Sequence, residues 1–259
     1  MKQPLAIFFF LFAALIHLDL KAQPLGAERF YGIDDFEFVY YSNNGELFKK
    51  HQEKIYRFYD IQLGEITSVD LINPLKILVF YRETQTVVLL DNRFNELERI
   101  PLSSLQPYRY IEHAALAGER LLWLHNIDEN LIELYNYVDG NMQSRTPPLK
   151  GIVQHLYTDY NFCHVLIDSV VSSYNIYGSK TAALSIKDTR HLSFDLKTLV
   201  MLENDTIKRY RFGGEFRFRE SGTQTIKIDF ENLKDTYLKA GKLYLWNGKN
   251  LLIHHLEQN

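Results

Sequence analysis

Short apolar runs alternate with polar turn residues along most of the chain. The runs are rich in Val, Ile, Leu, Tyr and Phe, residue types that favour β-strands. Between them stand pairs such as Asn44-Gly45 and Gly213-Gly214, which readily reach the positive φ of hairpin turns. Helical periodicity does not persist across these turns, and 231–239 is the best candidate for a short helix. The pattern predicts an all-β protein with strands at 38–41, 76–81, 86–90, 120–125, 131–137, 162–167, 199–202, 206–212, 225–230, 242–246 and 251–255.

The expected strands fall into modules of about 40 residues, a repeat length typical of propeller blades. In the clearest modules two apolar strands are followed by a more polar one. This order predicts a β-propeller of five or six small blades, with an irregular β-sandwich as the alternative. The chain has neither a Trp-Asp nor a kelch signature. The expected modules are 29–62, 63–105, 108–148, 150–187, 190–220 and 223–257.

The last module contains only three recognisable strands. A ring of blades has to close, since otherwise a sheet edge remains unpaired. We therefore expect an N-terminal segment near 29–33 to supply the missing outer strand.

The N-terminus has the pattern of an export signal. Lys2 precedes an unbroken apolar run over 5–16, and the small residue Ala22 stands at a suitable cleavage position. The run is shorter than the roughly 20 residues that a membrane-spanning helix needs, although a short membrane anchor is the alternative. We expect residues 1–22 to be a signal peptide and 23–259 to form a single propeller domain without a membrane span.

Composition narrows the possible functions. The net charge of −3 argues against a chain built mainly to bind nucleic acid. The single cysteine, Cys163, excludes an internal disulfide, and its apolar surroundings predict a buried thiol. Cys163 and His164 are adjacent on an expected strand, so they should face opposite sides rather than form a nucleophilic pair.

The sequence contains no recognised catalytic or nucleotide-binding motif. Carboxylate pairs at Asp34-Asp35, Asp128-Glu129 and Glu96/Glu98 stand in turns or on polar strands, where solvated charge is expected. His254 and His255 should point to opposite faces of a strand, which disfavours a shared metal. We therefore expect no catalytic residue, no cofactor and no metal ion.

The segment 207–219 interleaves basic and aromatic residues around Gly213-Gly214. A two-residue turn there would pair Phe212 with Glu215 and Tyr210 with Arg217. Such a hairpin could bind nucleic acid, but the negative net charge of the chain argues against that. Cation–π pairs on a blade surface or a basic docking patch are the favoured interpretations.

Two loops contain apolar residues at positions where a solvated turn would be polar. Such side chains either fold back onto the blade or contact a partner. The candidate partner-docking residues are Asn73, Pro74, Leu75, Asp91, Asn92, Arg93 and Phe94.

The first third of the chain resembles a known family. The stretches that carry the resemblance are Gly32-Ile33-Asp34-Asp35, Tyr40-Tyr41, Leu63-Gly64-Glu65-Ile66-Thr67-Ser68-Val69-Asp70, Asn73-Pro74-Leu75-Lys76-Ile77-Leu78-Val79-Phe80-Tyr81 and Val87-Val88-Leu89-Leu90-Asp91-Asn92-Arg93. They resemble exported propeller-like proteins of gliding-type bacterial envelopes, a family that includes the plug subunit of the type IX secretion translocon. The resemblance is clearest over 29–105, and the last three modules lack comparably distinctive motifs.

The resemblance implies a non-enzymatic protein of the periplasm, peripheral to the outer membrane. Its implied role is to occlude the periplasmic mouth of a large outer-membrane barrel, so the expected partner is an outer-membrane protein complex. By itself the chain is expected to be monomeric. The alternative that the residues leave open is an exported carbohydrate-binding or carbohydrate-active propeller, with tyrosines as stacking platforms.

Overall fold

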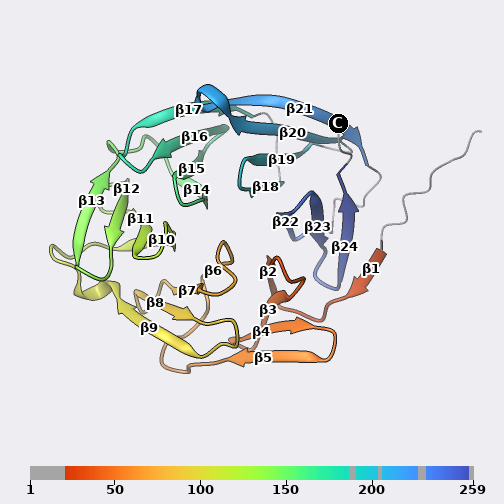
Figure 1. Cartoon of the computed structure of the whole chain (residues 1–259), viewed down its shortest axis with the longest axis horizontal. Helices are drawn as coiled ribbons and strands as arrows, with labels where there is room; N and C mark the ends of the chain where they lie inside the picture. Colours follow the sequence, from red (N-terminus) through yellow and green to blue (C-terminus); the bar gives the residue numbers. More distant parts are fainter. Residues whose placement is uncertain (1–20, 187–190, 204–205, 227–231, 257–259) are drawn as a thin grey trace, which may run out of the picture.

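The structure is a ring of six four-stranded antiparallel sheets, each of which is one blade of a β-propeller (Figure 1). It is a computed structural model that describes residues 21–186, 191–203, 206–226 and 232–256. The propeller prediction is confirmed, with six blades. Most of the predicted signal peptide falls on 1–20, outside the described residues.

Five blades are formed by consecutive strands, with the first strand nearest the centre of the ring. We name the strands of a blade A to D from the centre outward. Blade 1 contains β2 (Arg29–Ile33), β3 (Val39–Asn43), β4 (Glu46–His51) and β5 (Lys54–Phe58), and blade 2 contains β6 (Ser68–Asp70), β7 (Ile77–Tyr81), β8 (Thr86–Leu90) and β9 (Glu96–Pro101). Blade 3 contains β10 (Ile111–Leu116), β11 (Leu121–Asn126), β12 (Leu131–Asn136) and β13 (Asn141–Arg145). Blade 4 contains β14 (Val153–Thr158), β15 (Phe162–Ile167), β16 (Val170–Asn175) and β17 (Lys180–Ser185), and blade 5 contains β18 (His191–Asp195), β19 (Thr198–Glu203), β20 (Thr206–Gly213) and β21 (Arg217–Thr225).

Blade 6 joins the two ends of the described chain. It contains β22 (Asp235–Lys239), β23 (Lys242–Trp246) and β24 (Asn250–His255), and β1 (Lys21–Pro24) pairs with β24 as the outer strand. An N-terminal segment therefore supplies the outer strand of blade 6, as predicted. That strand is β1, however, and the predicted position near 29–33 is wrong. Residues 29–33 form the inner strand β2 because Phe30 and Ile33 are buried, whereas an outer strand such as β9 is mostly exposed.

The hydrophobic core is divided among the contacts between neighbouring blades. In β7, Leu78 and Phe80 pack against blade 3, whereas Ile77 and Val79 pack against blade 1. Successive side chains of a strand point to opposite faces, so a middle strand between two other blades is buried on both faces. This explains why middle strands such as β7 and β8 are apolar at nearly every position rather than alternating.

The boundary between blades 5 and 6 differs from the prediction. Strand β21 continues to Thr225, so the fifth module does not end at 220 and no inner strand begins at 225. The inner strand of blade 6 is β22, in the segment expected to be a short helix. Thr236 and Leu238 are buried while Tyr237 faces the other side, an alternation that suits a strand. Most of the predicted strand at 225–230 falls on 227–231, outside the described residues.

The described strands are joined by turns and two short 3₁₀ helices, at Leu102–Ser104 and Gly214–Phe216. Within the described ranges, no helix has the length and apolar character that a membrane crossing requires.

Candidate docking face

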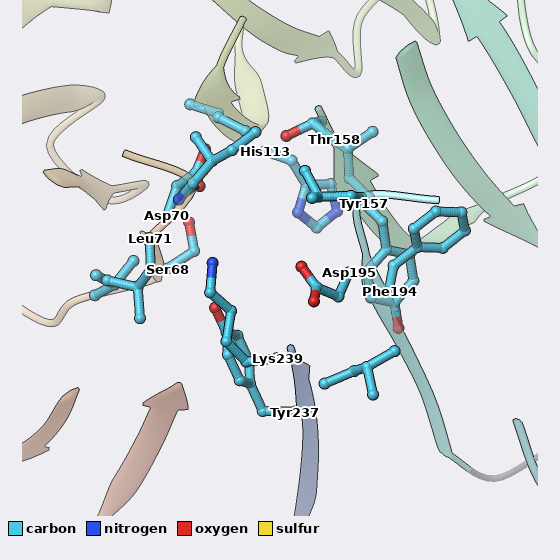
Figure 2. A pocket seen from close by; sticks show the side chains of 17 residues that line it. Ser68, Asp70, Leu71, His113, Tyr157, Thr158, Phe194, Asp195, Tyr237 and Lys239 are labelled. Atoms are coloured by element: carbon cyan, nitrogen blue, oxygen red, sulfur yellow. Dashed lines mark hydrogen bonds between the residues drawn. The ribbon is translucent and has the colours of Figure 1, made fainter. Parts of the chain in front are cut away.

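The inner strands of five blades surround a cavity of about 210 Å³ (Figure 2). Figure 2 shows the Lys239 and Asp195 side chains projecting into it from neighbouring blades. Burial, reinforced by the nearby His125, lowers the pKa of His113 in the cavity wall to about 4, so this imidazole is neutral at pH 7. The cavity is smaller than the roughly 300–1,000 Å³ typical of ligand pockets. Its polar lining includes Ser68, Asp70, His113, Thr158, Asp195 and Lys239.

The charged groups of the cavity connect loops of adjacent blades. Asp70 accepts hydrogen bonds from the backbone N–H of Ile72 at 2.9 Å and from that of Leu116 in blade 3 at 2.7 Å. Burial raises the pKa of Asp70, and these two hydrogen bonds act against that increase. Asp195 of blade 5 accepts from the N–H of Ala240 in blade 6 at 2.7 Å. These carboxylates thus fix the relative positions of loops around the cavity mouth.

The sixth blade is tied to the first in the same region. Lys239 places its Nζ 3.0 Å from Oδ1 of Asp35, and Lys242 places its Nζ 2.8 Å from Oε1 of Glu37. Asp35 and Glu37 lie in the loop between β2 and β3. The ends of the inner strands are therefore held in a defined ring around the cavity.

One face of the propeller carries the loops between strands A and B and between strands C and D. We call it the A–B face. At the tips of its A–B loops stand Phe36, Leu75, Tyr160 and Leu196, each from a different blade, with exposed fractions of 60, 60, 39 and 63%. Single exposed apolar residues are common on protein surfaces. Their recurrence at equivalent loops around one cavity produces an apolar ring, which marks this face as a candidate interaction surface.

The C–D loops add an outer set of exposed apolar side chains to the same face. These are Val138 in blade 3, Tyr177 in blade 4 and Phe216 in blade 5. The A–B face therefore presents apolar side chains both at its centre and at its periphery.

The predicted docking residues Asn73, Pro74 and Leu75 all lie on the A–B face. The Asn73 side chain accepts the N–H of Leu75 at 2.9 Å, which stabilises a tight turn. The next residue, Lys76, pairs with Glu119 of blade 3 at 3.0 Å. The turn and the ion pair hold the loop so that the Leu75 side chain remains exposed.

The second predicted docking loop also lies on the A–B face, but its apolar side chain is buried. Asp91 accepts the N–H groups of Arg93 and Asn95, leaving the side chains of Asn92 and Arg93 exposed. Phe94 is only 5% exposed, and its ring lies 6.0 Å from that of Tyr40. Phe94 thus folds back into the core, where it belongs to the buried cluster of Tyr40 and Leu90, and is not available for docking.

Phe36, Tyr160 and Leu196 were not among the predicted docking residues. Each is an apolar residue within a polar turn, as in Asp35-Phe36-Glu37 and Asp195-Leu196-Lys197. This signal becomes visible only after the six modules are aligned, because the repeats differ in length and sequence.

The basic hairpin of blade 5 has a different register from the predicted one. Phe212 pairs with Phe218 and Arg211 with Arg219, because the turn is the 3₁₀ segment Gly214–Phe216 instead of a two-residue Gly-Gly turn. The aromatic side chains of the hairpin therefore share the face that packs on blade 4. Arg209, Arg211, Arg217 and Arg219 share the opposite face, toward blade 6.

The predicted placement of the cysteine and histidine side chains is confirmed. Cys163 is a buried free thiol packed toward blade 3, and His164 faces blade 5, where it stacks on Phe194. His254 is buried and His255 exposed. Across the described ranges, no group of three or more His, Cys, Asp or Glu residues is arranged to hold a metal ion.

Comparison with solved structures shows the fold. The chain is similar to a chain of the mitotic checkpoint complex, with a TM-score of 0.60 and 11% identity over 88% of this chain and 74% of that one. It is also similar to the WD40 domain of Neurospora crassa Pan2, with a TM-score of 0.59 and 9% identity over 90% and 76%, and to the computationally designed Ika8 protein, with a TM-score of 0.52 and 13% identity over 84% and 70%. No protein-family model and no curated protein matches the sequence. The structural likeness shows a WD40-like propeller fold, and the sheets of this chain give the number of blades as six.

Proposed function

We propose that this protein is a non-enzymatic docking propeller whose A–B face binds a protein partner. The observation that carries the proposal is the apolar ring of Phe36, Leu75, Tyr160 and Leu196 around the cavity mouth. Burial of exposed apolar side chains is the main favourable contribution to protein association. One of the similar structures comes from a multiprotein complex, the mitotic checkpoint complex, which is consistent with a propeller acting as a docking scaffold.

The finer proposal is that the partner is a large outer-membrane β-barrel and that the propeller occludes its periplasmic end. It rests on the export-signal pattern and on the resemblance of 29–105 to envelope proteins that include the type IX secretion plug. A plug has to dissociate when substrate arrives, which favours an interface of limited area with interspersed charge. Asp35, Glu37 and Lys239 beside the apolar ring meet that requirement.

The proposal is tested by recovering the tagged mature protein from detergent-solubilised envelopes and identifying bound proteins by mass spectrometry. We expect a large outer-membrane barrel in stoichiometric amount with the unaltered protein. The Leu75→Asp/Leu196→Asp variant should lose it, because two charges would be buried in the interface.

The matched control is Ile61→Asp/Ile152→Asp. It changes two exposed apolar residues in loops between strand D of one blade and strand A of the next, on the face opposite the A–B face. Equal recovery of the barrel with both double variants would reject the A–B face as the docking surface. Recovery of no barrel with any of the proteins would reject the plug role and make a glycan-binding screen the next experiment.

A further inference from the structure

A second cavity, of about 270 Å³, lies between blades 5 and 6 where they reach the A–B face. Leu238 and Leu256 contribute apolar surface to it, and Arg209 and Arg211 contribute positive charge, while the ammonium group of Lys242 in its wall pairs with Glu37 of blade 1. We call this cavity the arginine groove. A neighbouring hollow that shares Arg211 and Ser221 with it adds Arg217 and Arg219, so the positive surface continues to the edge of the blade.

Two of these arginines form no ion pair with a described residue. Arg211 and Arg217 are exposed and have no ion-pair partner among the residues that the structure describes, whereas Arg219 pairs with Glu215 at 3.2 Å. Arg211 lies directly opposite Arg219 across the hairpin. Like charges at directly opposed positions destabilise a sheet, and here the Glu215 carboxylate compensates the charge of Arg219 alone. Such costs are characteristic of functional sites.

The groove adjoins the apolar part of the docking face. Leu196, in the A–B loop of blade 5, is 63% exposed and follows Asp195, which lines the groove. A segment lying along the groove would contact guanidinium groups in the groove and the apolar Leu196 side chain at one end.

We propose that the arginine groove binds an acidic peptide segment of the protein partner, one that carries Asp or Glu together with apolar residues. This inference rests on the proposed docking function and identifies the part of the partner that is recognised. The planar guanidinium group binds a carboxylate through two parallel hydrogen bonds, which gives geometric specificity as well as affinity.

The charge distribution favours a short acidic segment over an extended polyanion. The chain has a net charge of −3, and carboxylates of Asp195, Glu215 and Glu220 lie beside the arginines. A nucleic acid backbone or an anionic membrane would extend beyond the groove and meet this negative surface. A short peptide can place one carboxylate against Arg211 or Arg217 without contacting this negative surface.

The inference is tested by fluorescence anisotropy with a labelled peptide that contains Asp, Glu and Leu. A second peptide with Asn and Gln in place of the acids tests the requirement for charge. We expect binding of the acidic peptide only, weakened by added salt. Arg211→Gln/Arg217→Gln should lower the affinity by about tenfold per arginine, since each lost bond involves two charged groups.

The matched control is Lys54→Gln/Lys150→Gln, which removes the same charge at exposed positions outside the groove. Thermal melting of each variant verifies that it is folded. The inference is overturned if the acidic peptide does not bind, if both double variants lose affinity equally, or if a single-stranded oligonucleotide or vesicles of anionic phospholipid bind more tightly through the same arginines.

The outcome is separable from that of the docking function. If Arg211→Gln/Arg217→Gln still recovers the barrel from envelopes in full amount and the peptide does not bind, the groove assignment fails while docking through the apolar ring stands. If the acidic peptide binds but no barrel is recovered, the groove assignment stands and the proposed partner fails.

Discussion

Lys49 places its ammonium group 3.2 Å from the carboxylate of Asp34, and both side chains are buried inside blade 1. The Asp34 carboxylate also accepts the hydroxyl of Tyr40 and the backbone N–H groups of Phe36 and Phe38. Asp34 is therefore not the solvated turn charge that the sequence suggested. It links the core strand β4 to the loop that presents Phe36 on the A–B face.

Breaking this pair should destabilise the fold. Lys49→Met leaves the Asp34 carboxylate buried without its counter-charge, and we expect the free energy of unfolding in urea to fall by about 3–5 kcal/mol. Adding Asp34→Asn should restore part of the loss, because the buried charge is then removed. Lys50→Met, at the adjacent exposed position, is the control. Equal stability of the two single variants would show that the ion pair contributes little.

A buried histidine should make the fold sensitive to acid. His164 lies 2.7 Å from the Ser173 hydroxyl and stacks on Phe194 at 4.2 Å, and burial lowers the pKa of its imidazole to about 3. In the unfolded chain the pKa of histidine is about 6.5, so the unfolded state binds the proton more readily. The contribution of His164 to stability is thus present above about pH 6.5 and is lost as the pH falls toward about 3.

The loss should reach about 1.4 kcal/mol per pH unit between those two values. We expect His164→Phe to flatten the pH dependence of urea unfolding, although it removes the partner of Ser173. His255→Phe, at an exposed position, should leave the pH dependence unchanged. Parallel pH profiles for the wild-type protein and His164→Phe would assign the acid sensitivity to another group, such as His113.

The role of β1 as the outer strand of blade 6 can be tested by shortening the N-terminus. A chain that begins at Gln23 keeps the pairing of Gln23 with Leu251 and of Pro24 with Asn250, so its melting temperature should match that of the full chain. A chain that begins at Glu28 loses β1 and the partly buried Leu25 and leaves the edge of β24 unpaired. We expect its melting temperature to fall by about 5 °C or more. Identical melting curves would show that closure does not depend on β1.

The propeller could be predicted from the sequence because blade-to-blade packing buries whole strands. The apolar runs that include β7 and β8 are bounded by polar turns, which identifies them as strands and indicates a repeat of about 40 residues, although the number of blades stayed open between five and six. The inner and outer strands were harder to place. β22 is short and polar at both ends, and β1 acquires its role only by pairing with a strand far away along the chain.

The docking face could be predicted only in part, because exposure is decided by tertiary contacts. Leu75 and Phe94 are both apolar residues in loops, and the sequence gives no reason to separate them. The structure separates them because Phe94 packs beside Tyr40 in the core, whereas Leu75 lies at the tip of its loop. Likewise, the turn length decides which side chains of the arginine hairpin share a face. Phe212 pairs with Phe218 rather than with Glu215, and this odd register shift moves the side chains of β21 to the other face relative to β20.

Leu75 and Phe94 should therefore respond differently to the same change. Phe94→Ala removes a side chain that is 5% exposed, and we expect the free energy of unfolding to fall by about 3–5 kcal/mol. Leu75→Ala removes one that is 60% exposed, and the change should stay within about 0.5 kcal/mol. Urea unfolding of the two variants measures both values. If Leu75→Ala proved as destabilising as Phe94→Ala, Leu75 would belong to the core and could not contact a partner. If instead Leu75→Ala keeps its stability and recovers less of the barrel, its contribution is to the interface, since the folded state would be unchanged.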